Sequence, residues 1–321
     1  MGYVQNAPLV DLVGVGLNAT DTLIHVSTFP LSGSKIEYEA ETIMPGGQVA
    51  TAVIACQTWG LSTRYVGKLG DDDASRLHAR EFQRAGTDAH LINVAYTPSA
   101  RSLILVDRDG ERTVLCRRDE RLTLQPEELQ REWIINARAL HVDGHDTTAA
   151  TLAARWAREA GVLVIADLDD AYEGVDELLT NIDFLIVSRD LPGRLTGKPN
   201  LKTALREMQS RFGCRLTAAT LGADGVLAWD GEQFHHAPAF HVPASDTTGA
   251  GDIFHAGFIY GLLQGWPLPR ILDFSCAAAA INCMAEGARG GICPVDQVEL
   301  FMTITPRYEA ADDLAEPAAA I

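Results

Sequence analysis

Short apolar runs alternate with segments of helical period along most of this chain of 321 residues. The apolar runs are 9–16, 63–67, 139–143, 162–167, 184–188 and 216–221. The helix-period segments lie near 48–60, 73–85, 148–160, 201–212, 251–264 and 269–286. Because this alternation places a helix between successive parallel strands, it predicts an α/β fold with a central, mostly parallel sheet flanked by helices.

Two stretches, 22–44 and 97–118, break the alternation and are rich in Thr, Val, Ile, Tyr and Ser. The second contains Asp107 to Gly110, which has the composition of a hairpin turn. We expect both stretches to form a small β-sheet inserted into one domain of residues 1–308. Residues 309–321 consist largely of Ala, Asp, Glu and Pro, and predict a disordered tail.

Charge and hydropathy limit the class of protein. The formal net charge is -17 and no basic stripe offsets it, which excludes a nucleic-acid phosphate surface. No basic N-terminal segment precedes a long apolar stretch, and no window approaches 18 uncharged apolar residues. The six cysteines show no Cys-x-x-Cys spacing. We therefore expect a cytoplasmic protein with reduced thiols and no membrane partner.

The run from Asp246 to Asp252 carries the clearest chemistry. Gly249 and Gly251 let the backbone turn sharply and bring its N–H groups close to a ligand, at the positive end of the helix expected from Asp252 onward. A carboxylate is poorly placed beside a bound anion unless it accepts a proton there. The run therefore indicates a general base next to an anion hole, as in phosphoryl transfer.

This run resembles, residue for residue, the C-terminal signature of the ribokinase-like (PfkB) carbohydrate kinase family. The resemblance implies a ribokinase-like fold in which the two β-rich stretches form a lid, and transfer of the γ-phosphoryl of Mg-ATP to a sugar hydroxyl. It implies that Asp252 takes the proton from the acceptor hydroxyl, while the N–H groups of Gly249, Ala250 and Gly251 bind the transferred phosphoryl. No Walker A motif is present.

The stretch that begins at Gly46 and Gly47 resembles the N-terminal signature of the same family, which holds the acceptor sugar. The resemblance assigns Gly46, Gly47, Gln48 and Thr51 to acceptor binding. Thr51 stands where the family commonly has Asn, and a hydroxyl makes fewer hydrogen bonds than an amide. The acceptor is therefore expected to differ from ribose or fructose.

Residues 14–19, Gly-Val-Gly-Leu-Asn-Ala, also fit the fingerprint of a dinucleotide-binding site. Residues 22–30 argue against that interpretation, because they are β-branched and end in proline where the motif needs a helix. Asn18 and Asp21 instead follow the first strand, at the end where open α/β sheets bind ligands. Asp21 matches the acceptor-binding aspartate of the family, so both residues are assigned to the acceptor site.

The nucleotide site is assigned from the same resemblance. It comprises the loop after the strand at 216–221 and part of the helix expected at 273–286. It also includes the position where many family members have Asn near the magnesium. The assigned residues are Thr220, Gly222, Gly225, Ala280, Asn282 and Ser188.

Ser188 replaces that Asn, and Leu191 takes the place of a family Glu. Mg²⁺ is therefore expected to be held mainly by ATP and water, helped by Asp167 or Asp169. Asp246 and Thr248 match positions that bind a monovalent cation, which makes potassium activation a hypothesis.

Arg101, Arg117 and Arg118 fall in or beside the expected lid. They suit a phosphate or sulfonate on an acidic acceptor, although a solvated lid face explains them more simply.

The sequence thus predicts an ATP-dependent sugar kinase, with a nucleoside kinase of the same fold or a non-catalytic sugar-binding relative as alternatives. The lid should leave strand edges and apolar residues uncovered, which predicts a homodimer through the lid.

Overall fold

A computed structural model of the protein describes residues 10–108 and 112–309. Its main sheet has nine strands in the order β13-β12-β11-β10-β9-β8-β1-β4-β5. These strands are β1 Val10–Val15, β4 Thr63–Leu69, β5 Asp88–Asn93, β8 Ala137–Asp143, β9 Leu163–Leu168, β10 Phe184–Ser188, β11 Leu216–Thr220, β12 Val226–Trp229 and β13 Phe234–Ala237. The strands from β11 to β5 pair in parallel, and β12 and β13 add antiparallel strands at one edge. The predicted α/β fold with a mostly parallel sheet is confirmed.

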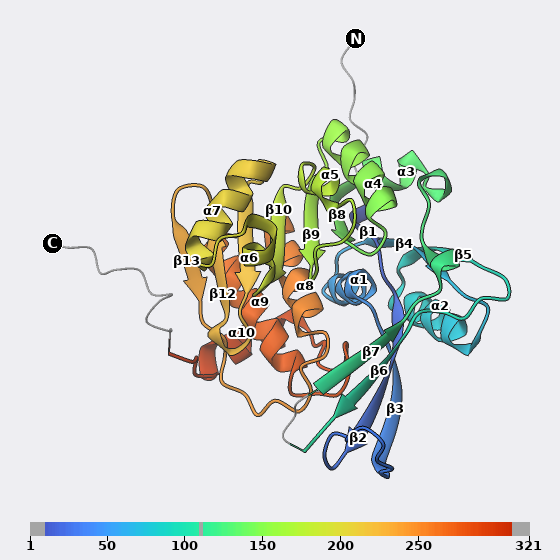
Figure 1. Ribbon diagram of the computed structural model, residues 1–321. Coiled ribbons are helices and arrows are strands. Elements are labelled where there is room, and N and C mark those ends of the chain that lie inside the picture. The colour runs from blue at the N-terminus through green and yellow to red at the C-terminus, as the bar shows by residue number, and fades with distance from the viewer. Residues whose placement is uncertain (1–9, 109–111, 310–321) are drawn as a thin grey trace.

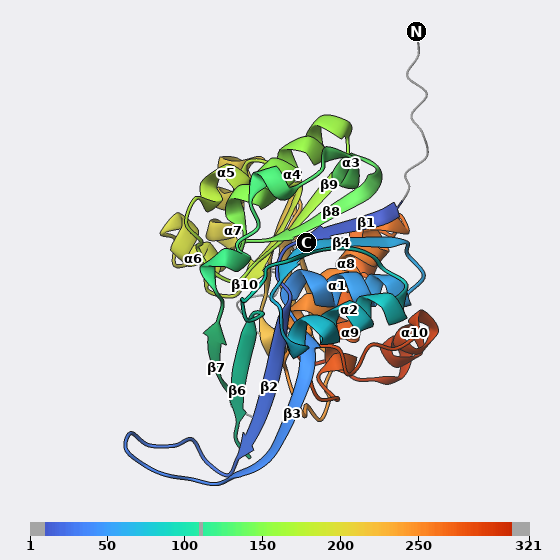
Figure 2. The ribbon, with the colours of Figure 1, turned by 90° about the vertical axis from the view of Figure 1, so that its right-hand side faces the viewer.

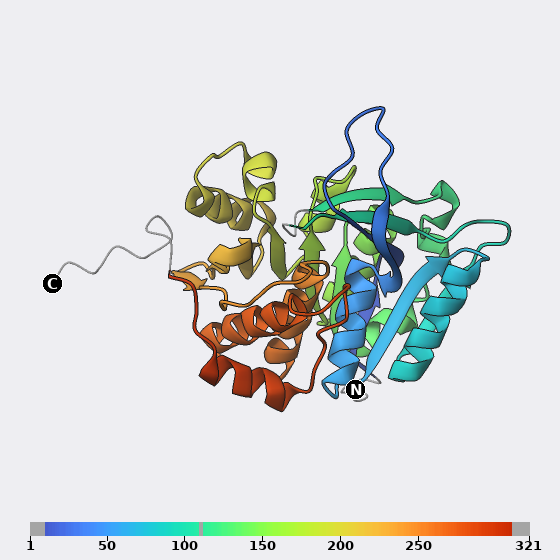
Figure 3. The same cartoon turned by 90° about the horizontal axis from the view of Figure 1, so that it is seen from below.

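Helices cover both faces of this sheet (Figures 1 and 2). One layer contains α1 Gln48–Thr58, α2 Asp73–Ala85, α8 Ala250–Leu263, α9 Leu268–Asn282 and α10 Val295–Ile304. Seen from below, α1, α2, α9 and α10 (blue, cyan, orange and red) lie along one side (Figure 3). The other layer contains α3 Arg131–Ile135, α4 Thr147–Ala160, α5 Val175–Leu179, α6 Leu191–Thr196 and α7 Leu201–Phe212. Short 3₁₀ helices within residues 10–108 and 112–309 are η1 Glu120–Leu122, η2 Pro126–Glu128 and η3 Gly222–Asp224.

The helix α8 lies in the middle of its layer, between α1 and α9. It is apolar on nearly every side, as expected of a helix enclosed by neighbours. A Cβ on Gly257 would lie 2.8 Å from the Cα of Ser275 in α9, so this glycine allows the two helices to pack closely. That packing fixes the direction of α8, and with it the position of its N-terminus.

A second sheet of four strands, in the order β3-β2-β6-β7, projects from the carboxyl end of the main sheet (Figure 2). Its strands are β2 Ala19–Val26, β3 Tyr38–Gly46, β6 Arg101–Val106 and β7 Arg112–Arg117. The central pair β2 and β6 is parallel, and the outer pairs are antiparallel. We call this second sheet the lid. Residues 109 and 110 of the predicted turn and residues 310–321 of the predicted tail lie outside the described residues.

Several elements differ from those predicted. The edge strands β12 and β13 are not among the predicted apolar runs; β13 contains His235 and His236 and pairs with β12 in antiparallel orientation. The helix expected to reach residue 286 ends at Asn282, whose side chain accepts a hydrogen bond from the N–H of Gly291 where the chain turns back. None of the helices in the described part of the chain is long and apolar enough to cross a membrane.

Candidate active site

Two cavities lie at the carboxyl end of the main sheet, where α8 begins. The larger has a volume of about 420 Å³, and Thr220, Gly251 and Ala280 are among its lining residues. The smaller has a volume of about 300 Å³, and its lining includes Asp21 and Asp252. Among the residues described, Arg112 of the lid strand β7 is shared by both linings. The two cavities therefore meet beneath the lid, beside the N-terminus of α8.

The loop before α8 is held by buried side chains. Gly249, the N-cap, has φ 74°, and a Cβ there would lie 2.4 Å from the carbonyl oxygen of Ala288, so only glycine fits without strain. The carboxylate of Asp246 accepts hydrogen bonds from the N–H groups of Thr248, at 2.8 Å, and Gly287, at 2.7 Å. The amide of Asn282 donates to the carbonyl of Thr248 at 3.1 Å. The first turn of α8 is thereby fixed facing both cavities.

Backbone donors at this turn are suited to an anion. Gly249 lines the smaller cavity, and Ala250 and Gly251 line the larger one. The N–H of Ala250 also makes a long hydrogen bond of 3.3 Å to the carbonyl of Thr247. Since the positive end of the helix dipole adds to these donors, the turn favours negative charge where the cavities meet.

Asp252 lies in the first turn of α8 and lines the smaller cavity. Burial raises the pKa of Asp252 to about 7, the nearby Asp167 carboxylate adds to that rise, and His255 opposes it. Burial also raises the pKa of Asp167, helped by Asp169 and Asp143. A carboxyl group that titrates near neutral pH is well matched to accept a proton from a hydroxyl.

His255 follows on the same helix and is not among the residues that line the smaller cavity. Its Nδ1 lies 2.8 Å from the carbonyl oxygen of Gly251 and 3.4 Å from Oδ2 of Asp167. Burial lowers the pKa of His255, so the imidazole is held neutral. This side chain therefore supports the first turn of α8 and the buried Asp167 from behind.

Asp21 lies on β2, across the smaller cavity from α8. Burial raises the pKa of Asp21 to about 6, against the effects of a hydrogen bond from Ser102 and the charge of Arg289. A Cβ on Gly46 would lie 2.0 Å from Oδ2 of Asp21, so the glycine leaves room for this carboxylate. Gly47 and Gln48 line the same cavity. The structure thus brings together three of the predicted acceptor residues, namely Asp21, Gly47 and Gln48.

Two other predicted acceptor residues lie behind the cavity wall. Asn18 is buried, and its Nδ2 donates to Tyr65 Oη at 2.7 Å and to the carbonyl of Lys68 at 3.0 Å. Thr51 is fully buried, and its Oγ1 accepts a hydrogen bond from Arg289. Neither residue is among those lining the smaller cavity. Both support the wall rather than forming its surface.

The larger cavity contains most of the residues predicted to bind the nucleotide. Thr220, Gly222, Gly225 and Ala280 line it. Ser188 lies outside the lining and donates through Oγ to the carbonyl of Asp169 at 3.2 Å. Asn282 is fully buried, and both ends of its amide bind the backbone. Asn282 therefore supports the loop before α8 instead of meeting a ligand.

The described residues contain no group of three or more His, Cys, Asp or Glu side chains placed to hold a metal ion. The Oγ1 of Thr248 is buried and has no hydrogen-bond partner within residues 10–108 and 112–309. Such an oxygen, beside the Asp246 carboxylate, suits a weakly bound monovalent cation. Asp167 is a single buried carboxylate beside Asp252, which suits a divalent cation that arrives with its other ligands.

Sequence reasoning missed two arginines at the site. Arg112 reaches from the lid to Oγ1 of Thr247 in the loop before α8. Arg289 is the partner of Thr51, and it lies in the segment after α9. An isolated arginine after a turn or a helix carries no local signal, so only the folded arrangement identifies these side chains.

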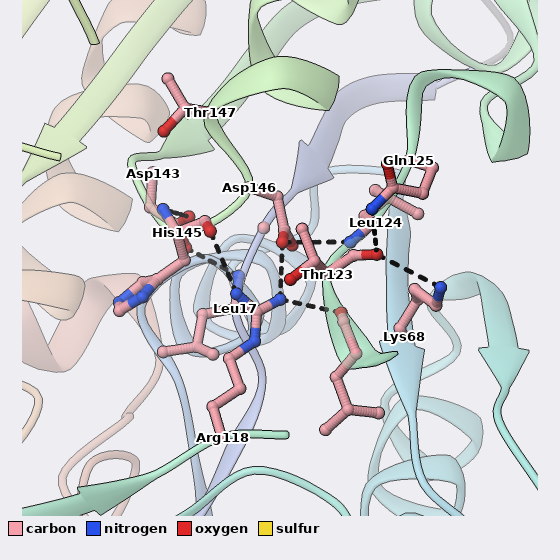
Figure 4. Close-up of polar contacts among 12 residues, drawn as sticks. Leu17, Lys68, Arg118, Thr123, Leu124, Gln125, Asp143, His145, Asp146 and Thr147 are labelled. Carbon is pink, nitrogen blue, oxygen red and sulfur yellow. Dashed lines mark hydrogen bonds and ion pairs between the residues drawn. The ribbon is translucent and has the colours of Figure 1, made fainter. Parts of the chain in front are cut away.

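Polar contacts also join β1, β8 and the end of the lid (Figure 4). Asp143, at the end of β8, accepts hydrogen bonds from the N–H of Leu17 at 2.7 Å and of His145 at 3.0 Å. Asp146 accepts from Arg118 at 2.6 Å and from the N–H of Leu124 at 3.1 Å. These contacts anchor one end of β7 to the main domain.

A model of the pfkB family carbohydrate kinases matches residues 12–294. The chain belongs to this family. An ATP-dependent ribose-1-phosphate kinase of Halopiger xanaduensis is 30% identical, over 92% of this chain and 99% of that one. An aminoimidazole riboside kinase of Salmonella typhimurium is 30% identical, over 81% of this chain and 88% of the relative.

The solved structures agree on the fold. The ribokinase of Thermotoga maritima has a TM-score of 0.81, with 24% identity over 92% of this chain and all of that one. The kinase is therefore a phosphotransferase that acts on a hydroxyl group, with a ribokinase-like fold.

Proposed function

We propose that this kinase transfers the γ-phosphoryl of Mg-ATP to a hydroxyl of a small carbohydrate, with Asp252 as general base. One observation carries the proposal: a carboxyl group with a pKa of about 7 lines the acceptor-sized cavity beside the N-terminus of α8. The acceptor occupies the smaller cavity, and the nucleotide occupies the larger one. The reacting groups then meet beside Arg112, where the two cavities join.

Each residue of the proposed site has a separate role in the reaction. Asp252 removes the proton from the attacking hydroxyl, while Asp21 and Gln48 hold other hydroxyls of the acceptor. The N–H groups of Gly249 and Gly251, with the dipole of α8, stabilise charge on the transferred phosphoryl. Catalysis therefore rests on positioning and electrostatics, as in other phosphoryl transfers.

The remaining assignments concern cofactors. Thr220, Gly222, Gly225 and Ala280 surround the nucleotide, which brings Mg²⁺ with it, and Asp167 is the proposed protein carboxylate near that ion. When bound, Mg²⁺ neutralises phosphate charge.

A monovalent cation beside Asp246 and Thr248 would strengthen the anion site. Equal turnover in potassium-containing and potassium-free buffer would remove the cation from the proposal.

A nucleoside kinase is the second candidate, because one relative acts on aminoimidazole riboside. A nucleoside base calls for an apolar, aromatic-lined pocket. The described lining of the smaller cavity contains no Phe, Tyr or Trp, which favours a small carbohydrate. A non-catalytic sugar-binding role is disfavoured by the intact Asp252.

We also propose a homodimer through the lid and a cytoplasmic location. Leu103 and Leu115 lie opposite each other on β6 and β7, and their exposed fractions are 43% and 54%. A second copy would cover these side chains and the open strand edges.

The proposed cytoplasmic location is in keeping with the cysteines, which all carry free thiols, as in a reducing compartment.

The test is ADP release with Mg-ATP against ketoses, aldoses, sugar acids, phosphosugars and nucleosides, for wild type and Asp252→Asn. Removing the base should lower kcat by about 10²–10⁴-fold with the fold and nucleotide binding preserved. Equal turnover by the variant would refute the role of Asp252. Activity with nucleosides alone would establish the second candidate.

A further inference from the structure

The smaller cavity concentrates positive charge in a protein of net charge -17. Its lining includes four arginines against three aspartates, which are Asp21, Asp169 and Asp252. Burial raises the pKa of Asp252 to about 7, so this acid carries only part of its charge near neutral pH. Four guanidinium groups line one small cavity, which a neutral sugar does not require.

Three of the four arginines are held by other parts of the protein. Arg118 donates to Asp146 and to the carbonyl oxygens of His145 and Leu122, so it anchors the end of the lid (Figure 4). Arg112 contacts Thr247 beside α8. Arg101 donates to Oδ2 of Asp72 at 2.9 Å.

Arg117 is different. Within the described part of the chain, its guanidinium has no hydrogen bond and no ion pair. It also lies directly opposite Arg101 in the pairing of β6 with β7. Like charges directly opposite each other destabilise a sheet. Asp72 forms an ion pair with Arg101. The charge of Arg117 adds only a small part to the lowering of the pKa of Asp119, which is caused mainly by Arg121, so the Arg117 guanidinium keeps its donors available at this end of the cavity.

We propose that the acceptor carries an anionic group, a phosphate or a carboxylate, and that Arg117 binds this group while the reacting hydroxyl lies at Asp252. The inference rests on the proposed kinase function and specifies its substrate class. A guanidinium binds either oxyanion through paired, charge-assisted hydrogen bonds. Arg101, on the neighbouring strand, adds positive charge beside the same group.

Equilibrium binding without ATP tests the anion site apart from turnover. Calorimetric titrations would use ribose 1-phosphate, ribose 5-phosphate, gluconate and ribose with wild type, Arg117→Gln and Arg108→Gln. Arg108 is the matched control, because it lies at the other end of the lid in an exposed ion pair with Glu39 and does not line the cavity.

At least one anionic ligand should bind wild type about 10-fold or more tightly than ribose. Arg117→Gln should weaken that binding by about 10–100-fold and leave ribose binding unchanged, while Arg108→Gln should behave as wild type. A phosphate ester that binds while gluconate does not would identify phosphate as the group, and the reverse result would identify carboxylate.

The inference is wrong if no anion binds more tightly than ribose, or if Arg117→Gln leaves the Kd of the anions unchanged. Turnover of a neutral sugar that disappears in Asp252→Asn would then preserve the kinase function without the anion site. Conversely, anion binding that depends on Arg117, together with no turnover of any acceptor, would separate the anion site from the proposed catalysis.

Discussion

Arg289 donates a hydrogen bond from Nε to Oγ1 of Thr51, at 3.2 Å, across 238 positions of sequence. Its Nη2 also donates to the carbonyl oxygen of Gly46 at 2.9 Å. Burial lowers the pKa of Arg289 to about 10, so the side chain stays charged at neutral pH. One guanidinium therefore joins the C-terminal part of the chain to the start of α1, where the wall of the smaller cavity begins.

Replacing Arg289 should weaken acceptor binding without affecting the nucleotide. Arg289→Met leaves the Gly46 carbonyl without its partner and frees the loop beside Asp21, so KM for the acceptor should rise about 10-fold. Thr51→Val removes only one of the two contacts and serves as the milder comparison. Steady-state kinetics with each substrate varied in turn would check this, and an equal rise in KM for ATP would contradict it.

Activity should depend on pH through Asp252. Burial disfavours the carboxylate, so Asp252 retains its proton up to about pH 7. Below that value kcat/KM should fall about tenfold per pH unit, and the fall should steepen below about pH 6 as Asp21 also gains a proton. A profile flat from pH 5 to 8, at constant ionic strength, would contradict the assignment.

The same pKa predicts an effect on stability. Between the ordinary carboxyl pKa and about 7, the unfolded chain loses a proton that folded Asp252 retains, so its contribution to stability decreases as pH rises. Asp252→Asn should therefore raise Tm more at pH 8 than at pH 5. Thermal melts of both proteins at the two pH values would measure the difference, and a shift of the same size at both would argue against it.

Removing the Asn282 amide should destabilise the fold. Asn282→Ala leaves the Thr248 carbonyl and the Gly291 N–H without their partner in a buried site, which should cost about 1–3 kcal/mol in the free energy of unfolding. Urea denaturation would measure this loss, with the exposed Asn93→Ala as control. A variant as stable as wild type would show that the loop before α8 keeps its conformation without the Asn282 amide.

The lid should make the protein a dimer. Light scattering should give twice the mass of one chain for wild type and one mass for Leu115→Lys, with the same Tm, because Leu115 is more than half exposed in the single chain. A monomeric wild type would remove the proposed interface. A dimeric Leu115→Lys would place it elsewhere.

Local sequence was sufficient to place Gly249 and Asp252 together at the start of one helix, as the structure has them. That their spacing makes an anion site beside a base stays a prediction. Strand and helix periods likewise predicted the parallel sheet. These features depend on neighbours only a few residues apart.

The roles of the other side chains at the site depend on tertiary contacts. Nothing near Thr51 in the sequence shows that its hydroxyl meets Arg289, and the amide of Asn282 looks like an exposed polar group on a helix of small residues. Arg112 is an ordinary lid arginine until β6 and β7 are placed over α8. In each case the role of the side chain is set by a partner that lies far away in sequence.

The order of strands has a consequence for synthesis on the ribosome. β1 lies between β4 and β8 in the main sheet. Both edges of β1 can therefore be paired only after β8 has been synthesised. The turn that carries Asp252 can form its stabilising contacts only later still, because Asn282, Gly287 and Gly291 provide them. A nascent chain can therefore complete the wall of the smaller cavity and the first turn of α8 only when nearly all of the protein has emerged.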